Sequence, residues 1–577
     1  MSSAPETSPQ DAPTDSTESS TPPRKSRLAT VATRILLGWL LFVLVGQTFI
    51  WGFWDPPMGM SLQLLVTYGM VVVTTALALT WLAFFAPLSR KARAAIVIPC
   101  LLLIGAFAGS VRDIEWTGDM RLIWHFKWQK PQQQKLAEYL ETTETTRPVA
   151  ADVEIPEVTP EDMAEYRGPR RDGVVTGPEL TTDWSADPPE EIWSHPCGEG
   201  YSSFAVLGDF AITLEQRGED EVVVCYDAAT GDTRWTHAYP ASFDEAMGGP
   251  GPRATPTIDN GQVFSVGAEG DLVCLDLLTG QPAWHVNILE ANNLPNLEWA
   301  ISGSALVLGE RVIVNAGGPE GNGLIAYDRN SGDVIWKAAG LKELPEEGAD
   351  RNWAGYSSPM LVSLDGVEQI LSFEGHGLRS YDPKTGDDLW FYPFHSGGGD
   401  PGVNVAQPTV LEGDRVFITA SYGRGCAMLK VSRAEDDWKT ETLWDNKFMR
   451  CKFTSPVLYE GNLYGLDEGI LVCLDGETGK RKWKRGRYGH GQVLLTNGQL
   501  VLLSEDGEIV LVEASPDGHN ELGRQKVLEG SKTWNPPALV RGRLYLRNHL
   551  EAACYDLRAD ASTSVETASV DSTPRSE

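Results

Sequence analysis

Residues suited to binding a ligand recur between positions 201 and 534, at intervals of about 40 to 60 residues. They are aromatic rings, two cations, a carboxylate, an amide and a histidine: Tyr201, Arg253, Glu298, Trp299, Tyr356, Asn404, Lys452, His490 and Trp534. If the fold gathers them, flat rings beside cations can hold a small planar anion or a peptide segment. Glu215 and Arg217 are further candidates, although a hydrogen-bonded network between strands is the more ordinary role for such residues.

Other chemistries lack their motifs in this sequence. His490 has no second His or Cys at metal-ligand spacing, so a hydrogen-bonded or exposed histidine is favoured over a metal ligand. The glycine-rich stretch at residues 318–323 precedes a strand pattern and not a helix, unlike a phosphate-binding loop. No C-x-x-C-H occurs, so no haem of the c type is attached. The net charge of −31 argues against nucleic acid as a partner.

The elements that must position the candidates are written in a repeated phrase. VCYDAATGDTRW ends at Trp235, and four further copies end at later tryptophans. In each copy an Asp can accept backbone N–H groups in a turn, a Gly supplies positive φ, and a Trp can wedge between neighbouring repeats. The predicted docking residues are Asp227, Gly231, Trp235, Asp276, Gly280, Trp284, Asp328, Gly332, Trp336, Asp382, Gly386, Trp390, Asp475, Gly479 and Trp483.

A second phrase precedes the first, and it reads as a hairpin of alternating apolar residues around turns such as Asn260-Gly261 and Asn497-Gly498. Eight such hairpins predict an all-β, eight-bladed propeller of four-stranded blades at residues 184–558. The last blade lacks its Trp strand, and residues 190–196, which contain Trp193, are expected to close the ring in its place. The fifth and seventh repeats lack the full Asp and Gly pattern.

Three apolar runs at about residues 35–54, 62–88 and 94–111 are each long enough to cross a bilayer as a helix. Basic residues precede the first run and separate the second from the third, which predicts a cytoplasmic N-terminus and a periplasmic propeller anchored in the inner (cytoplasmic) membrane. Residues 1–34 and 559–577 are expected to be disordered, and 112–183 to be a juxtamembrane linker. Trp116 and Arg121 are expected at the outer membrane interface.

The eight cysteines do not suggest a disulfide framework. Cys225, Cys274, Cys473 and Cys554 share one repeat position, which Ala or Ser fills elsewhere, so they are small buried strand residues. Cys197, Cys426 and Cys451 remain candidates for pairing, which the sequence leaves open.

The repeated spacing resembles the tryptophan-docking motif, A-x-D-x-x-x-G-x-x-x-W, of pyrroloquinoline-quinone (PQQ) dehydrogenases. The same motif occurs in PQQ-like propellers that bind no quinone, including the BamB lipoprotein of outer-membrane assembly. The phrases GEGYSSFAV, GGPGPRATPT and YRGPRRDGV are similar to those of PQQ-like propellers predicted in planctomycete-type bacteria.

This resemblance implies two functions. The first is a binding or scaffold module without a cofactor, with a possible protein partner in the envelope. The second is a PQQ-dependent dehydrogenase that passes electrons to membrane quinone. For it, Glu298 and Asn404 are the candidate Ca²⁺ ligands, Arg253 the cation on the quinone, and Glu215 or Asp400 the base. The compact repeats favour the first. The absence of an adjacent Cys-Cys pair does not decide between them, because membrane-anchored glucose dehydrogenases of the family also lack that pair, and the anchored architecture keeps the second open.

Overall fold

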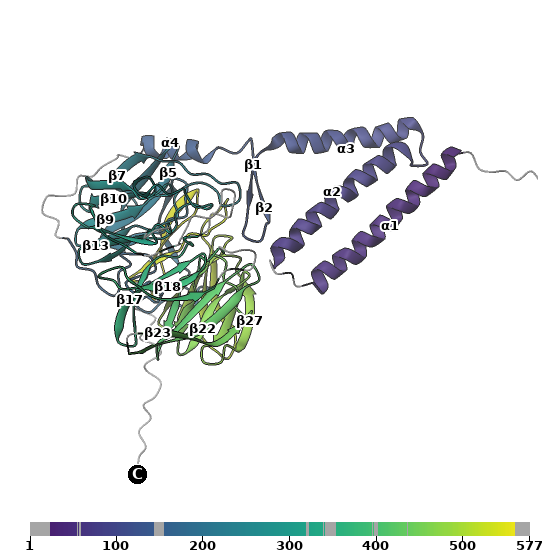
Figure 1. Cartoon of the computed structure of the whole chain (residues 1–577). Coiled ribbons are helices and arrows are strands. Elements are labelled where there is room, and N and C mark those ends of the chain that lie inside the picture. The colour runs from purple at the N-terminus through teal and green to yellow at the C-terminus, as the bar shows by residue number, and fades with distance from the viewer. Residues whose placement is uncertain are drawn as a thin grey trace, which may run out of the picture. The chain divides into compact units, whose positions relative to one another are not determined.

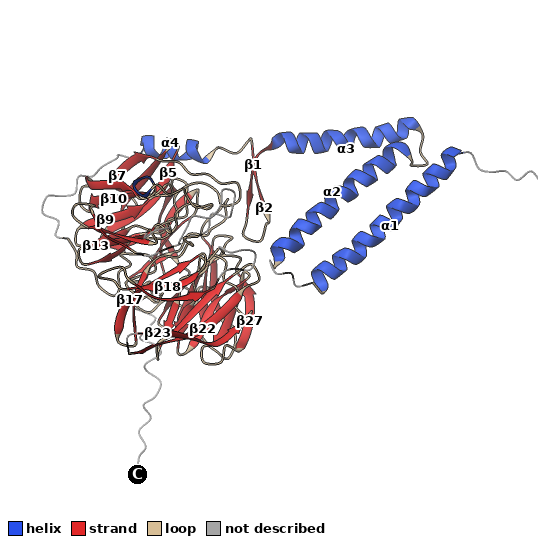
Figure 2. Ribbon diagram, in the orientation of Figure 1, coloured by secondary structure: helices blue, strands red, loops and turns tan. Residues whose placement is uncertain are grey.

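The computed structural model describes residues 24–142, 155–318, 322–338, 340, 353–394, 396 and 402–559, apart from Asp55, Pro57, Met58 and Asp436. The chain divides into two compact units, one made of residues 1–54 with 65–109 and the other of residues 55–64 with 110–577. Figures 1 and 2 trace three long helices and a body of strands. The disorder predicted for residues 1–23 and 560–577 lies outside the described residues.

Three helices long and apolar enough to cross a membrane form the first unit: α1 (Arg24–Gly52), α2 (Met60–Phe84) and α3 (Arg90–Ser110). Helix α1 begins before the predicted span, so residues 24–34 are helical and not part of a disordered tail. The reason is local, because Pro22 and Pro23 are followed by a run without Pro or Gly up to Gly38, and Pro is tolerated only at the start of a helix.

Eight four-stranded antiparallel sheets confirm the predicted propeller. The strands of the first seven blades, from the axis outward, are β4 (Ala205–Leu207), β5 (Phe210–Arg217), β6 (Asp220–Asp227), β7 (Thr233–Pro240); β8 (Thr257–Asp259), β9 (Gln262–Val266), β10 (Asp271–Asp276), β11 (Pro282–Asn287); β12 (Leu306–Leu308), β13 (Arg311–Asn315), β14 (Leu324–Asp328), β15 (Val334–Lys337); β16 (Met360–Leu364), β17 (Val367–Glu374), β18 (Gly377–Tyr381), β19 (Asp388–Pro393); β20 (Thr409–Leu411), β21 (Arg415–Ala420), β22 (Gly425–Ala434), β23 (Asp437–Asn446); β24 (Val457–Tyr459), β25 (Asn462–Asp467), β26 (Ile470–Asp475), β27 (Arg481–Arg487); β28 (Gln492–Thr496), β29 (Gln499–Leu503), β30 (Glu508–Glu513) and β31 (Glu521–Lys526).

The eighth blade joins the two ends of the propeller sequence, as predicted. Strands β32 (Ala538–Val540), β33 (Arg543–Arg547) and β34 (Glu551–Asp556) are completed by β3 (Glu190–Pro196), which pairs with β34 and places Trp193 opposite Cys554. This closure leaves the ring without a free blade edge.

The tryptophans pack from one blade onto the next. The Trp193 ring covers Gly231, and the rings of Trp235, Trp284 and Trp336 cover the equivalent glycines of the blades that follow. Gly231 has φ of 75°, a value that an L side chain rarely adopts. The indole of Trp235 also donates to the Leu277 carbonyl of the next blade at 2.8 Å.

In the two irregular blades, five and seven, the tryptophan docking position is filled in different ways. In blade five Trp444 still covers Gly479 of blade six. In blade seven Gly523 stands opposite Leu511, where blade six has Trp483 opposite Cys473. The Trp184 ring lies against Gly523 and fills the space of the missing tryptophan.

Residues 112–183, predicted as a linker, contain structure. They include most of a hairpin, β1 (Val111–Trp116) and β2 (Leu122–Phe126), and the helix α4 (Gln132–Thr142). A short 3₁₀ helix, η1 (Glu290–Asn292), follows β11. All eight cysteines are unpaired, including Cys197, Cys426 and Cys451.

Candidate functional site

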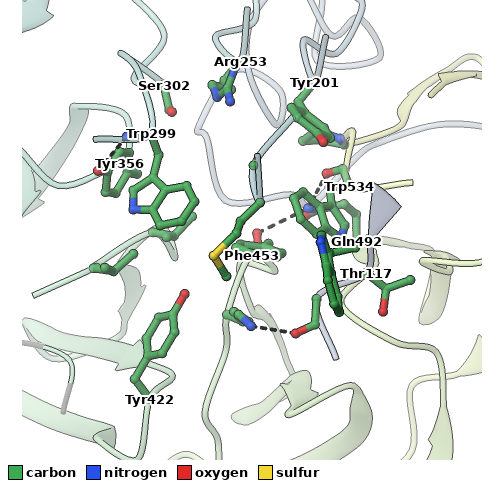
Figure 3. A pocket seen from close by; sticks show the side chains of 18 of the residues that line it. Thr117, Tyr201, Arg253, Trp299, Ser302, Tyr356, Tyr422, Phe453, Gln492 and Trp534 are labelled. Atoms are coloured by element: carbon green, nitrogen blue, oxygen red, sulfur yellow. Dashed lines mark hydrogen bonds between the residues drawn. The ribbon is translucent and has the colours of Figure 1, made fainter. Parts of the chain in front are cut away.

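A cavity of about 190 Å³ lies where the loops before the inner strands meet. Six of the predicted residues line it: Tyr201, Arg253, Trp299, Tyr356, Lys452 and Trp534. Phe453 contributes a further ring. Figure 3 shows the side chains around the central space and labels Tyr201, Arg253, Trp299, Tyr356, Phe453 and Trp534. The residues meet because each stands a few positions before the innermost strand of its blade, so the ring symmetry brings one residue per blade to the axis.

Aromatic rings form a continuous part of the cavity wall. The rings of Tyr201 and Trp534 stack with centroids 5.2 Å apart, and Phe453 lies 4.4 Å from Trp534. Such a wall offers flat apolar faces to a ligand.

The two cations of the cavity have no carboxylate partner within ion-pair distance among the described residues. Arg253 donates to the carbonyls of Gly251 and Gly249, the latter at 2.9 Å, and its guanidinium lies over the Phe243 ring. Lys452 donates to the carbonyl of Gly118 at 2.7 Å. Burial lowers the pKa of both groups, since it disfavours their charged forms.

Two polar groups of the wall also lack hydrogen-bond partners among the described residues. They are the Tyr201 hydroxyl and the Trp299 indole N–H, both buried. Buried polar groups are normally hydrogen-bonded, so the cavity wall has capacity left for a polar ligand.

The other predicted residues do not line the cavity. Glu215 lies in a buried network between strands: Tyr226 donates to it at 2.7 Å, Arg217 at 3.0 Å, and the N–H of Gly198 at 2.8 Å. Burial alone raises the pKa of Glu215, but Arg217 and Arg547 lower it to about 2. This arrangement is the ordinary network that the sequence offered as the alternative to chemistry.

Asn404 and His490 have structural partners. The Asn404 amide donates to the carbonyls of Glu374 and Phe394 at 2.7 and 2.8 Å. His490 Nε2 lies 3.1 Å from Asp119 Oδ1. Within the described part of the chain, no three His, Cys, Asp or Glu side chains are grouped closely enough to hold a metal ion. Asp400 lies outside the described residues.

The turn of the β1–β2 hairpin was missed as part of the site. We call residues 116–121 the tip. Trp116, Thr117, Gly118 and Met120 line the cavity, although Trp116 was expected at a membrane interface. Arg121, expected there too, donates to Asp506 at 2.9 Å. The tip is a peptide segment held in the predicted funnel, and it belongs to the same chain.

A second segment, residues 162–175, runs along the inner strands, and we call it the axial segment. Its Arg171 is buried and donates to the carbonyls of Pro359 at 2.8 Å, Ser304 at 3.2 Å and Ala305. Arg167 reaches the carbonyls of Val493 and Pro456. Tyr166 of this segment lines the cavity. The phrase YRGPRRDGV therefore ties blades three, four, six and seven together at the axis.

The fold and the cavity define an eight-bladed propeller with a ligand-sized axial site. The profile of the family described as "Outer membrane protein assembly factor BamB" matches residues 184–342 and 219–485, together more than half of the chain. The chain belongs to this family of PQQ-like propellers.

Two curated proteins are also similar to it. The quinoprotein ethanol dehydrogenase of Pseudomonas aeruginosa is 25% identical over 321 residues, which cover 49% of this chain and 48% of that protein. The one from Pseudomonas putida is 24% identical over 214 residues, covering 32% and 33%. The chain thus spans less than half the length of these curated relatives.

Two solved structures also align with the chain. BamB from Moraxella catarrhalis aligns with a TM-score of 0.46 at 19% identity, covering 64% of this chain and 98% of that one. The quinohemoprotein alcohol dehydrogenase from Comamonas testosteroni aligns with a TM-score of 0.47 at 14% identity, covering 74% and 83%.

Proposed function

We propose that this protein is a membrane-anchored, periplasmic binding module that holds a small planar anion in its axial cavity without chemical turnover. The observation that carries the proposal is the pair Arg253 and Lys452, two largely buried cations beside aromatic rings with no described carboxylate within ion-pair distance. A buried cation without a carboxylate in direct contact is unfavourable, and a bound anion that touches it lowers that penalty.

The shape of the wall supports a flat ligand. The rings of Tyr201, Trp299 and Trp534 offer stacking surfaces, and the unpartnered Tyr201 hydroxyl and Trp299 N–H can donate to ligand oxygens. No reacting group is required for this role, so we assign none.

Anchoring follows from α1, α2 and α3. Basic residues at the start of α1 and at the start of α3 favour the cytoplasm for those ends, which leaves the propeller in the periplasm, where a protein partner in the envelope is accessible to it. Fusion of alkaline phosphatase after residue 559 tests this orientation. Activity of the fusion in intact cells is expected, and an inactive but stable fusion refutes it.

A quinoprotein dehydrogenase is the second candidate, and the two Pseudomonas relatives favour it. The described residues do not fit its cofactor site. Asn404 does not line the cavity, Glu215 is neutralised by arginines, and no three described His, Cys, Asp or Glu side chains are close enough together to hold a metal ion. We therefore derive no reaction step through PQQ or Ca²⁺.

Titration of the purified full chain separates the two candidates. The probes are PQQ and the smaller dianion 2,6-pyridinedicarboxylate, each with and without Ca²⁺, followed by tryptophan quenching. The binding module predicts saturable quenching that Arg253→Ala weakens by about tenfold or more, because a buried charge contact is lost. Arg415→Ala, which removes a peripheral arginine paired with Glu477, is the control. Stoichiometric PQQ with alcohol-dependent dye reduction would establish the dehydrogenase instead, and no binding of either probe would refute the anion site.

A further inference from the structure

The tip closes over the cavity through polar contacts that centre on Asp119. This side chain is 1% exposed. One carboxylate oxygen lies 3.1 Å from His490 Nε2, and the other accepts from Arg487 Nη1 at 3.1 Å. A carboxylate so buried is stabilised in place only by these partners.

The backbone of Gly118 is bound on both sides. Its N–H donates to Glu505 Oε1 at 2.5 Å, and its carbonyl accepts from Lys452 at 2.7 Å. A side chain at this position would meet the His490 ring, so only glycine allows the tip to approach this closely.

The tip is held from one side of the ring. In the described part of the chain, its hydrogen bonds to the propeller go to Lys452, Arg487, His490, Glu505, Asp506 and Lys532, which belong to blades six to eight and their connections. On its other side, toward blades two to four, the tip borders the cavity, which Arg253, Trp299 and Tyr356 also line. A segment attached along one side and facing a cavity on the other has the geometry of a lid.

We propose that residues 116–121 are a lid of the ligand site, latched by Asp119, and that Trp116 and Met120 contact the ligand when the lid is shut. This inference rests on the anion binding proposed above. Because a ligand touching the shut lid stabilises it, ligand binding and latching favour each other reciprocally. Strand β1 follows α3 in the chain without an intervening residue.

The latch is tested without any ligand by a cysteine reporter in the full chain. Thr117 is 4% exposed and is replaced by Cys, and its reaction with a soluble thiol reagent reports the open lid. Seven native cysteines are buried and Cys100 lies in α3, so the chain without the reporter supplies the background. Asp119→Ala is expected to accelerate labelling by about tenfold or more, with Asp119→Asn in between, because a buried paired charge is lost.

The matched control is Asp113→Asn on the same hairpin. Asp113 is 55% exposed at its side chain and pairs with its neighbour Arg112 at 2.7 Å, so its loss is expected to leave labelling unchanged. An unchanged melting temperature in all variants shows that the lid and not the propeller has opened. Equal labelling rates for Asp119→Ala and the parent would overturn the latch.

A second arm tests contact between the ligand and the lid. A saturating probe that binds, PQQ or 2,6-pyridinedicarboxylate, is expected to slow the labelling of Cys at position 117 severalfold. If the probe binds and the labelling rate does not change, the lid is not part of the ligand site. If neither probe binds, the proposed function fails, while the first arm still decides the latch.

Discussion

The axial segment and the tip both fill the central channel, yet they are attached by different chemistry. The axial segment uses Arg167 and Arg171, whose guanidinium groups donate to backbone carbonyls in or just before the inner strands of several blades. The tip uses a carboxylate, a histidine and cations on one side of the ring. The first arrangement holds blades together, and the second holds one segment against three blades.

This difference separates the scaffold from the part that can respond. Inner-strand carbonyls belong to the fold, so losing their donors leaves buried acceptors unsatisfied in several blades at once. The tip contacts connect side chains that water can solvate once the tip moves away, so its release need not unfold a blade.

The largest expected effect is that of removing Arg171. Arg171→Ala leaves the carbonyls of Ser304 and Pro359 without their donor and Glu165 without its ion pair at 2.7 Å. We expect the free energy of unfolding to fall by about 3 to 5 kcal/mol, measured by denaturant or thermal unfolding. The neighbour Arg170, 64% exposed at its side chain, is the control, and Arg170→Ala is expected to change stability by less than about 1 kcal/mol. Equal effects would show that the axial segment is not a structural hub.

The second-largest effect tests how much the closure of the ring by Trp193, separately from the axial segment, contributes to the stability of the propeller. In Gly231→Ala the new Cβ would lie 2.7 Å from the Trp193 ring, at a residue whose φ is 75°. Gly366 has φ of 74° and no atom near its Cβ position, so Gly366→Ala has the same backbone strain without the clash. We expect Gly231→Ala to be less stable than Gly366→Ala by about 1 to 3 kcal/mol. No difference between them would mean that Trp193 does not seal the ring.

A smaller effect on stability and a clear one on the tip is expected for Gly118→Ala. The methyl group would meet the His490 ring and lie 3.0 Å from Glu505 Oε1, which displaces the tip. Labelling of the Thr117→Cys reporter should rise by about tenfold, while unfolding changes by less than about 1 kcal/mol. Gly518→Ala, at a glycine with open space, is the control. A large loss of global stability would place the tip with the scaffold instead.

The smallest effect is a dependence on pH that should distinguish the two segments. Burial by itself raises the pKa of Asp119. The hydrogen bond with His490 and the charges of Arg487 and Lys452 together outweigh this effect and lower the pKa. Likewise, despite burial, His125, His549 and Lys532 lower the pKa of Glu115, at the base of the tip, to about 2. Lowered carboxyl pKa values stabilise docking above the ordinary values of 3.8 for Asp119 and 4.5 for Glu115, and this contribution is lost as the pH falls toward about 2.

For the axial segment, the expected effect of acid on stability has the opposite sign. Burial raises the pKa of Glu165, so acid does not weaken this contribution, and guanidinium groups stay charged throughout. Labelling at position 117 with a dipyridyl disulfide between pH 5 and 2.5 should increase before tryptophan emission reports global unfolding. If labelling and tryptophan emission change over the same pH range, the tip is not released before the propeller unfolds. Glu115→Gln should reduce the acid dependence of labelling.

Much of the fold was readable from the repeats. Asp227, Gly231 and Trp235 and their copies mark each blade, because a turn, a positive φ and a wedge are local requirements that recur with the blade. The position before each inner strand then located Tyr201, Arg253, Trp299, Lys452 and Trp534 in one cavity. Glu215, Glu298, Asn404 and His490 were predicted from the same residue types but are not among the residues that line the cavity, because side-chain direction depends on local backbone geometry.

The positions of the tip and the axial segment could not be predicted from the sequence, because neither segment is repeated along the chain. Asp119 and His490 are 371 residues apart and Arg171 and Pro359 are 188 residues apart, and no periodicity connects them. Trp116 and Arg121 matched a membrane-interface pattern by composition alone.

The sequence by itself determined the eight blades, the strand that closes them and the three apolar helices, since these follow from periodic or local patterns. Only the tertiary structure decided that two irregular segments enter the channel, one tied to backbone carbonyls and one latched by Asp119. Their placement depends on unpaired donors and acceptors that appear at the axis only after the ring has formed.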